Sequence, residues 1–179
     1  RDVIMELLFP GDFCGALCTA DSTPYSLSAV CLQDVDAGFV HRTRFHEAAL
    51  RHPGLLLKAT AVCRDKMQLQ REMAVGLAVE HADQRAARAL LSLAARLGTK
   101  GPEGTRLRMP LDRHGFAELI GTTTETAIRI LGRFRRQGYL IEEEEGHMTL
   151  PDLSALQNLT RIEEGDGLDP CHNRHASSH

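Results

Sequence analysis

The chain has 179 residues, of which 42% are apolar and 25% are charged, and its formal net charge is −3. That length suffices for one full domain, or for a partial domain joined to a small one. No apolar run approaches the roughly 20 residues that a membrane span needs, so we predict a cytoplasmic protein with no membrane contact. The acidic balance excludes binding of nucleic acid through overall charge, and any such surface must be a local basic patch.

The first part of the chain shows short β-type patterns separated by turns. A turn is predicted at Phe9–Asp12, short strands at Tyr25–Leu32 and Phe39–Val40, and a helical turn at Arg44–Ala49. The sequence begins at Arg1 and not at a methionine, and its first residues already have the pattern of the middle of a domain, so we expect an N-terminally truncated fragment.

The cysteine count is odd and the spacing is irregular, which argues against a disulfide framework and favours reduced, mostly buried thiols. The five cysteines are Cys14, Cys18, Cys31, Cys63 and Cys171. Cys14 and Cys18 form an alternative metal or redox pair, and Cys171 lies beside histidines. A metal site requires further ligands in both places, so we predict none.

A long amphipathic helix is predicted from Leu55 to about His81, with apolar residues at steps of three and four and charged residues over much of the rest. Such a stripe on so long a helix predicts pairing with a second copy of the chain, whereas packing against its own domain is the alternative. The predicted dimerisation residues are Leu56, Ala59, Cys63, Met67, Gln70, Ala74 and Leu77.

After this helix the pattern becomes that of a compact α+β domain. A second helix is predicted at Asp83–Leu97, a surface loop at Gly98–Gly104, and a short strand at Leu107–Met109. The tail from Gly165 has no apolar period and is predicted to be disordered.

The next segment has the pattern of a winged helix-turn-helix. Asp112 is a candidate cap for a helix at Arg113–Ile120, Gly121 suits a tight turn, and Thr122 with Glu125 matches a capping box for a helix ending near Gln137. Gly138 stops that helix. The wing is predicted as two strands, Tyr139–Ile141 and Met148–Leu150, around Gly146.

The exposed face of this second helix carries groups that can read DNA. Arg129 can donate to guanine O6 and N7, and Glu125 can accept from cytosine N4. Ile128 can contact a thymine methyl, and Arg133, with its neighbours Arg135 and Arg136, can reach phosphates. The alternative is a solvated arginine-rich helix that makes no contact with DNA.

The segments Arg113–Gly121 and Thr124–Leu131 resemble the DNA-binding motif of the Crp/Fnr family. Gly11-Asp12-Phe13 is similar to the family's sensor β-roll, and Asp83–Ala87 to the entry of its DNA-binding domain. The resemblance implies base contacts by Glu125, Arg129 and Thr124, and phosphate contacts by Arg113 and Thr126. It further implies a homodimer on a pseudo-palindromic site of double-stranded DNA and a loop near Thr99–Thr105 that contacts RNA polymerase.

The sensor part departs from the family pattern. The cyclic-AMP-binding members carry a Glu and an Arg-Ser pair where this sequence has Ala16 and Leu27-Ser28, and Gln70 and Arg71 replace small hydroxyl residues. A buried cyclic phosphate would lack its charge partner, so we predict that cyclic AMP is not bound and leave the effector unknown.

Two further departures concern metals and the wing. The iron–sulfur members have an internal cysteine at a position that falls near Ala37 here, so this sequence lacks that ligand. Binding of an iron–sulfur cluster or a haem by residues that precede this sequence stays an alternative. The wing is acidic at Glu142–Glu145, where the family often has Lys or His, so we expect it to contact DNA little, or only through His147.

The predicted fold class is α+β, with a partial cyclic-nucleotide-binding-like β-roll at 1–54 and a long dimerisation helix at 55–82. A winged helix-turn-helix follows at 83–160 and a disordered tail at 161–179. We predict a dimeric, sequence-specific transcription regulator whose sensor controls DNA binding allosterically. The alternative is a ligand- or redox-sensing interaction module without sequence-specific DNA binding. An enzyme is not predicted, because no catalytic constellation is visible.

Overall fold

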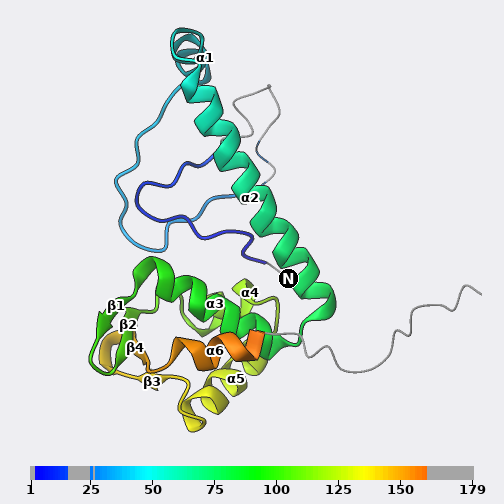
Figure 1. Ribbon diagram of the computed structural model, residues 1–179, viewed down its shortest axis with the longest axis vertical. Coiled ribbons are helices and arrows are strands. Elements are labelled where there is room, and N and C mark those ends of the chain that lie inside the picture. Colours follow the sequence, from blue (N-terminus) through cyan, green and yellow to red (C-terminus); the bar gives the residue numbers. More distant parts are fainter. Residues whose placement is uncertain (1–2, 16–24, 26, 161–179) are drawn as a thin grey trace, which may run out of the picture.

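The computed structural model describes residues 3–15, 25 and 27–160, and shows a long helix standing on a small α+β domain (Figure 1). The elements are α1 (Arg42–Arg51), α2 (Gly54–Val79), α3 (Ala82–Leu97), β1 (Thr99–Gly101), β2 (Gly104–Arg108), α4 (Arg113–Leu119), α5 (Thr124–Arg136), β3 (Ile141–Glu142), a short 3-10 helix (Glu144–Gly146), β4 (His147–Leu150) and α6 (Leu153–Thr160). Helices with a small antiparallel sheet confirm the α+β fold class.

The core of the molecule lies in the C-terminal domain. Helices α3 to α6 pack around a four-stranded antiparallel sheet with the order β1-β2-β4-β3. The largest fully buried side chains are Phe116, Phe134, Leu90, Leu93, Ile130, Leu131, Leu140, Leu150 and Leu156. Leu156 belongs to α6, which packs against α3 and which the sequence analysis did not predict, although Leu153, Leu156 and Leu159 recur at helical spacing.

The predicted surface loop at Gly98–Gly104 is wrong, because this segment forms most of a β-hairpin. Thr99 pairs with Arg106 and Gly101 with Gly104. Gly104 has a φ of +123°, and a Cβ there would lie 2.3 Å from the Leu150 carbonyl oxygen. A run rich in glycine therefore marks a tight reversal between paired strands, which composition alone does not distinguish from a loop.

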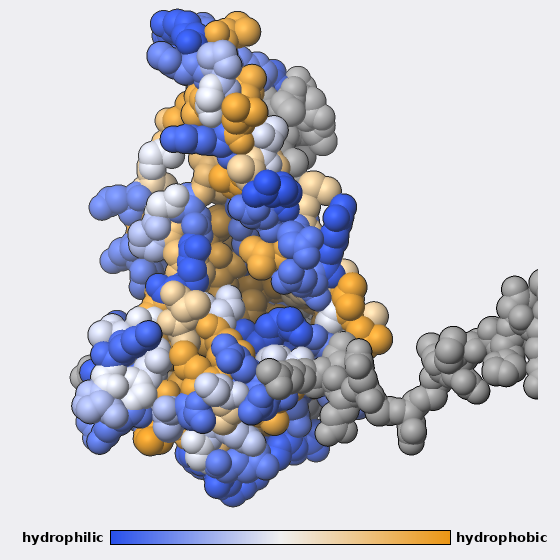
Figure 2. All heavy atoms as spheres, viewed as in Figure 1, coloured by the Kyte–Doolittle hydropathy of each residue, from blue (hydrophilic) through white to orange (hydrophobic). Residues whose placement is uncertain are grey.

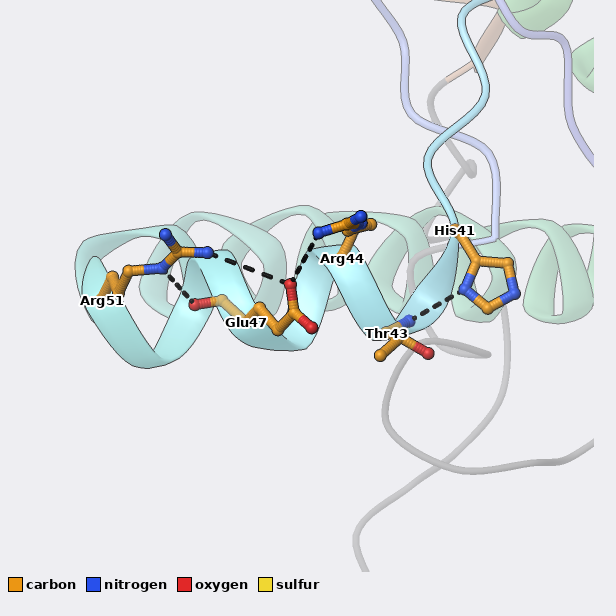
Figure 3. Close-up of polar contacts among 5 residues, drawn as sticks. All are labelled: His41, Thr43, Arg44, Glu47 and Arg51. Carbon is orange, nitrogen blue, oxygen red and sulfur yellow. Dashed lines mark hydrogen bonds and ion pairs between the residues drawn. The ribbon is translucent and has the colours of Figure 1, made fainter.

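Helix α2 confirms the long predicted helix within two residues at each end, and α1 sits at its far end (Figure 1). The helical turn predicted at Arg44–Ala49 is the middle of α1. His41 caps α1 by accepting a hydrogen bond from the Thr43 N–H at 3.3 Å (Figure 3). Glu47 pairs with Arg44 at 3.3 Å and accepts from Arg51 through its backbone carbonyl at 3.2 Å (Figure 3).

The strands predicted before α1 are wrong in the described part of the chain. Phe39–Val40 and the described residues of Tyr25–Leu32 belong to no ladder, and Phe39 is 87% exposed. A strand needs a neighbouring strand to bind its backbone groups, and none of the described residues supplies one here. The turn at Phe9–Asp12 is confirmed, with the Asp12 N–H donating to the Phe9 carbonyl at 2.9 Å.

Gly121 allows α2 to approach the turn between α4 and α5. Its φ is +64°, and a Cβ there would lie 2.4 Å from Cδ2 of Leu77. We therefore expect Gly121→Ala to lower the free energy of unfolding by about 1–2 kcal/mol, because alanine is strained in the left-handed backbone and the end of the Leu77 side chain must move aside.

Gly132 provides the matched control for this prediction. It lies inside α5, and the nearest atom to its built Cβ, Nη1 of Arg136, is 3.6 Å away. Gly132→Ala should raise the free energy of unfolding by up to about 1 kcal/mol, because alanine suits a helix interior better. Urea unfolding of the two variants measures whether the free energy of unfolding falls for Gly121→Ala and rises for Gly132→Ala. Equal changes in the two variants would contradict the prediction.

The segment 3–15 docks onto the C-terminal domain and α2. Arg96 pairs with Asp12 at 2.5 Å and lies over the Phe9 ring at 4.7 Å, while Lys66 pairs with Glu6 at 2.7 Å. Burial alone would raise the pKa of Asp12, but hydrogen bonds from Arg96 and from the Phe9 N–H outweigh it and lower that pKa below 3.8.

This lowered pKa gives a pH prediction for the docked segment. A carboxyl with a depressed pKa stabilises the folded arrangement above its ordinary pKa, and that contribution is lost as the pH falls through the lower folded value. We expect the Phe9 amide to lose protection from hydrogen exchange as the pH falls below about 4. Asp12→Asn should be poorly protected already at pH 6 and should change little with pH; an unchanged acid response in this variant would contradict the assignment.

Candidate nucleic-acid interface

The helix-turn-helix is built from local signals. Asp112 caps α4 by accepting from the Gly115 N–H at 2.7 Å, as predicted. The capping box predicted at Thr122 and Glu125 is wrong, because Thr123 caps α5 by accepting from the Thr126 N–H at 3.2 Å. The Thr122 N–H is bound to the Ala117 carbonyl, so Thr122 still belongs to the turn that closes α4.

Helix α5 has one buried and one exposed face. Ala127, Ile130, Leu131 and Phe134 are buried, as predicted. Glu125 and Arg129 lie one turn apart on the exposed face, and Ile128 beside them is 52% exposed. Neither charged side chain has a hydrogen bond or ion pair with another residue in the described ranges, so both are free to bind an external partner.

Three other predicted DNA contacts are engaged within the molecule. The Thr124 hydroxyl lies 3.1 Å from Nδ1 of His114, and the Thr126 hydroxyl accepts from that of Thr123 at 2.9 Å. Arg133 pairs with Asp83 in the first turn of α3. Contact of Arg133 with a phosphate therefore requires that it share or leave this carboxylate.

The wing lies beside the helix-turn-helix and turns at Gly146 as predicted, but its first strand is Ile141–Glu142 and not the predicted Tyr139–Ile141. The strands β3 and β4 pair antiparallel, and Gly146, with a φ of +75°, turns the chain between them. Glu142 pairs with Arg113, the predicted phosphate contact at the start of α4, and with Arg135 of α5 at 3.0 Å. These pairs were not predicted, although the run of glutamates at 142–145 beside arginine-bearing helices is present in the sequence.

Glu143 points its carboxylate to the other side of the wing sheet. It accepts from the Thr149 hydroxyl at 2.6 Å and from Nε of Arg106 at 2.7 Å. These two hydrogen bonds, the one from Thr149 more than the one from Arg106, lower the pKa of Glu143 from its ordinary value.

The predicted dimerisation stripe of α2 is largely uncovered. Leu56, Met67 and Leu77 are 43–47% exposed and Ala74 is exposed, whereas Ala59, Cys63 and Gln70 are half-buried. Other apolar residues of α2 are exposed as well: Leu57, Leu69, Val75 and Val79. Hydrophobic residues gather along this helix and between it and the C-terminal domain (Figure 2). A surface of this kind is typical of one that another chain covers.

The cysteines that the structure describes are free: Cys14 and Cys31 are exposed and Cys63 is half-buried. Cys18 and Cys171, like Ala16 and the tail at 161–179, lie outside the described residues, so the Cys14–Cys18 pair stays a prediction. In the described ranges, no three His, Cys, Asp or Glu side chains are grouped as metal ligands, and no helix is long and apolar enough to cross a membrane.

The fold and the exposed face of α5 define a winged helix-turn-helix domain. Comparison with protein families matches residues 84–159 to the Crp-like helix-turn-helix domain. The chain is 26% identical over 126 residues to the transcriptional activator protein FnrA of Stutzerimonas stutzeri, covering 70% of this chain and 51% of that protein. It is 26% identical over 150 residues to the transcriptional regulatory protein btr of Bordetella pertussis, covering 84% and 61%.

Solved structures give the same assignment. A CooA variant from Carboxydothermus hydrogenoformans has a TM-score of 0.61 at 27% identity, covering 66% of this chain and 55% of that one. FixK2 from Bradyrhizobium japonicum shares the fold, with a TM-score of 0.63 at 24% identity and coverage of 69% and 60%. Residues 84–159 thus form a Crp-like helix-turn-helix domain, and the chain resembles transcriptional regulators of the Crp/Fnr family. It spans between about half and three fifths of the length of these relatives.

Proposed function

We propose that this protein is a dimeric, sequence-specific DNA-binding regulator of transcription that acts in the cytoplasm. The observation that carries the proposal is the pair Glu125 and Arg129, exposed on α5 and without a partner among the described residues. In helix-turn-helix docking, the N-terminal half of the second helix enters the major groove and contacts base edges. Both residues lie in that half, in the first two turns of α5.

The dimer is supported by the uncovered apolar residues of α2, which a second copy of the same helix would bury. Two copies related by a twofold axis would present two α5 helices to one duplex. The site should then be pseudo-palindromic, with half-site centres about one helical turn, or 34–36 Å, apart. The β1–β2 hairpin, which includes the Thr99–Thr105 segment, stays free of these surfaces and is our candidate contact for RNA polymerase.

Allosteric control is supported by contacts between the end of α2 and the helix-turn-helix. Arg85 donates from Nε to the Ile120 carbonyl at 2.7 Å and from Nη1 to the Glu80 carbonyl at 2.5 Å. Leu77 packs against Gly121 in the same region. A signal that moves α2 would therefore also move the turn that positions α5, and with it the spacing of the two recognition helices.

The test is selection of bound duplexes from random DNA by the 179-residue chain, followed by affinity measurement between 50 and 200 mM salt. We expect an enriched pseudo-palindrome and affinity that falls with salt, because lysine and arginine contacts release counterions. Failure to enrich any motif, with no salt-sensitive binding, would contradict the proposal and favour an interaction module that binds only protein.

A further inference from the structure

One carboxylate of the wing is shared by two arginines that come from different helices. Oε1 of Glu142 binds Nη2 of Arg113, the first residue of α4, and Oε2 accepts from Nη1 of Arg135 at 3.0 Å. The side chain of Glu142 is 27% exposed, and those of Arg113 and Arg135 are 44% and 58% exposed. The three groups thus form one surface cluster with two positive charges and one negative charge.

This cluster lies beside the face that the proposed function turns toward DNA. Arg135 follows Arg129 on α5, and Arg113 begins the helix that supports α5. A phosphate that approaches either guanidinium meets the Glu142 carboxylate already bound there. Because exposed ion pairs are weak, the phosphate can replace it, but the displaced carboxylate then lies next to a like charge.

We infer that Glu142 reduces the affinity of this surface for duplex DNA of any sequence, because in the absence of DNA it binds Arg113 and Arg135 and offsets one of their two positive charges. The inference rests on the proposed function. It concerns phosphate contacts, which set affinity and register, and not the base contacts of Glu125 and Arg129. The loss is therefore equal for the specific site and for random DNA, and the ratio between the two affinities does not depend on Glu142.

If Glu142 instead positioned the two arginines for DNA, its removal would change the affinity in the opposite direction. If Glu142 held the two guanidinium groups in the geometry that phosphates require, its removal would weaken binding, because unordered side chains lose more entropy on binding. The geometry of the cluster favours competition, since each oxygen of Glu142 occupies a terminal nitrogen of one guanidinium group, where a phosphate oxygen could also bind.

The test is Glu142→Gln in the whole chain, with dissociation constants measured for the selected duplex and a random duplex between 50 and 200 mM salt. Glutamine keeps the shape and removes the charge. We expect tighter binding to both duplexes by the same factor. One additional effective cation steepens the slope of log affinity against log salt by about 0.9, so the gain should shrink about 3.5-fold from 50 to 200 mM.

Glu144→Gln is the matched control, because it makes the same charge change in the same wing. The Glu144 carboxylate has no ion pair within the part of the chain that the structure describes. Both substitutions are repeated in a chain carrying Arg113→Gln and Arg135→Gln. There the gain from Glu142→Gln should fall to no more than that of Glu144→Gln, whereas any effect of Glu144→Gln should persist. Thermal unfolding of each variant checks that the fold is kept, and Glu142→Ala should reproduce the sign.

The outcomes separate the two proposals. If the unaltered chain binds duplexes but Glu142→Gln weakens binding, gives the same gain as Glu144→Gln, or keeps its gain without the two arginines, the inference on Glu142 is overturned alone. If no variant binds any duplex, the proposed function is overturned and the inference falls with it.

Discussion

Phe134→Ala should lower the free energy of unfolding of the C-terminal domain by about 3–5 kcal/mol, the usual loss when a buried aromatic ring becomes a cavity. Phe134 is 1% exposed at the centre of the core that joins α3, α5 and the sheet. Its ring meets that of Tyr139 edge-on at 5.6 Å, and its carbonyl accepts from the Tyr139 N–H at 2.9 Å. One side chain thus fixes both α5 and the start of the wing.

The loss is large compared with the 5–15 kcal/mol by which domains are stable. Ile128→Ala is the control on the same helix, because Ile128 is 52% exposed and its removal leaves no cavity. We expect it to change the free energy of unfolding by no more than about 0.5 kcal/mol. Chemical denaturation followed by circular dichroism measures both, and similar losses for the two variants would show that α5 does not face the core as described.

The parts of the fold that sequence predicted are those that local interactions decide. The cap at Asp112, the turn at Gly121 and the stop at Gly138 each depend on a few adjacent residues, and the buried face of α5 follows from helical spacing alone. Even there the cap of α5 was misplaced by one residue. Both Thr122 and Thr123 can cap, and the hydrogen bond from Thr122 to Ala117 decides between them.

The parts that sequence missed depend on residues far apart in the chain. A β-prone run such as Phe39–Val40 forms a strand only where another strand meets it, and its own residues do not reveal that partner. Likewise, Arg133 is 50 residues from Asp83, and Arg113 is 29 residues from Glu142. A helical wheel of α5 shows that the Arg133 side chain can point outward. Only the packing of α3 against α5 shows that this side chain pairs with Asp83.

Glu125 and Arg129 have no partner among the described residues, so we expect substitutions there to have the clearest effect on DNA affinity. Arg129→Ala should weaken binding to the selected duplex by about 5- to 150-fold, the equivalent of 1–3 kcal/mol for a lost bidentate contact with guanine. Binding to random DNA should change much less, because no guanine is held at a fixed register there.

Arg136→Ala is the control for this substitution, since it removes the same side chain from the same helix at an exposed position farther from the helix N-terminus. A phosphate contact carries no sequence information, so this variant should weaken both duplexes alike and reduce the salt slope by about 0.9. Competition binding at constant salt separates the two patterns. If Arg129→Ala also weakened both duplexes alike, Arg129 would be a phosphate contact, and base reading would have to be assigned to Glu125 and Ile128 instead. Because base edges and phosphates lie at different depths in the groove, that outcome would also require α5 to sit farther from the groove floor than helix-turn-helix docking places it.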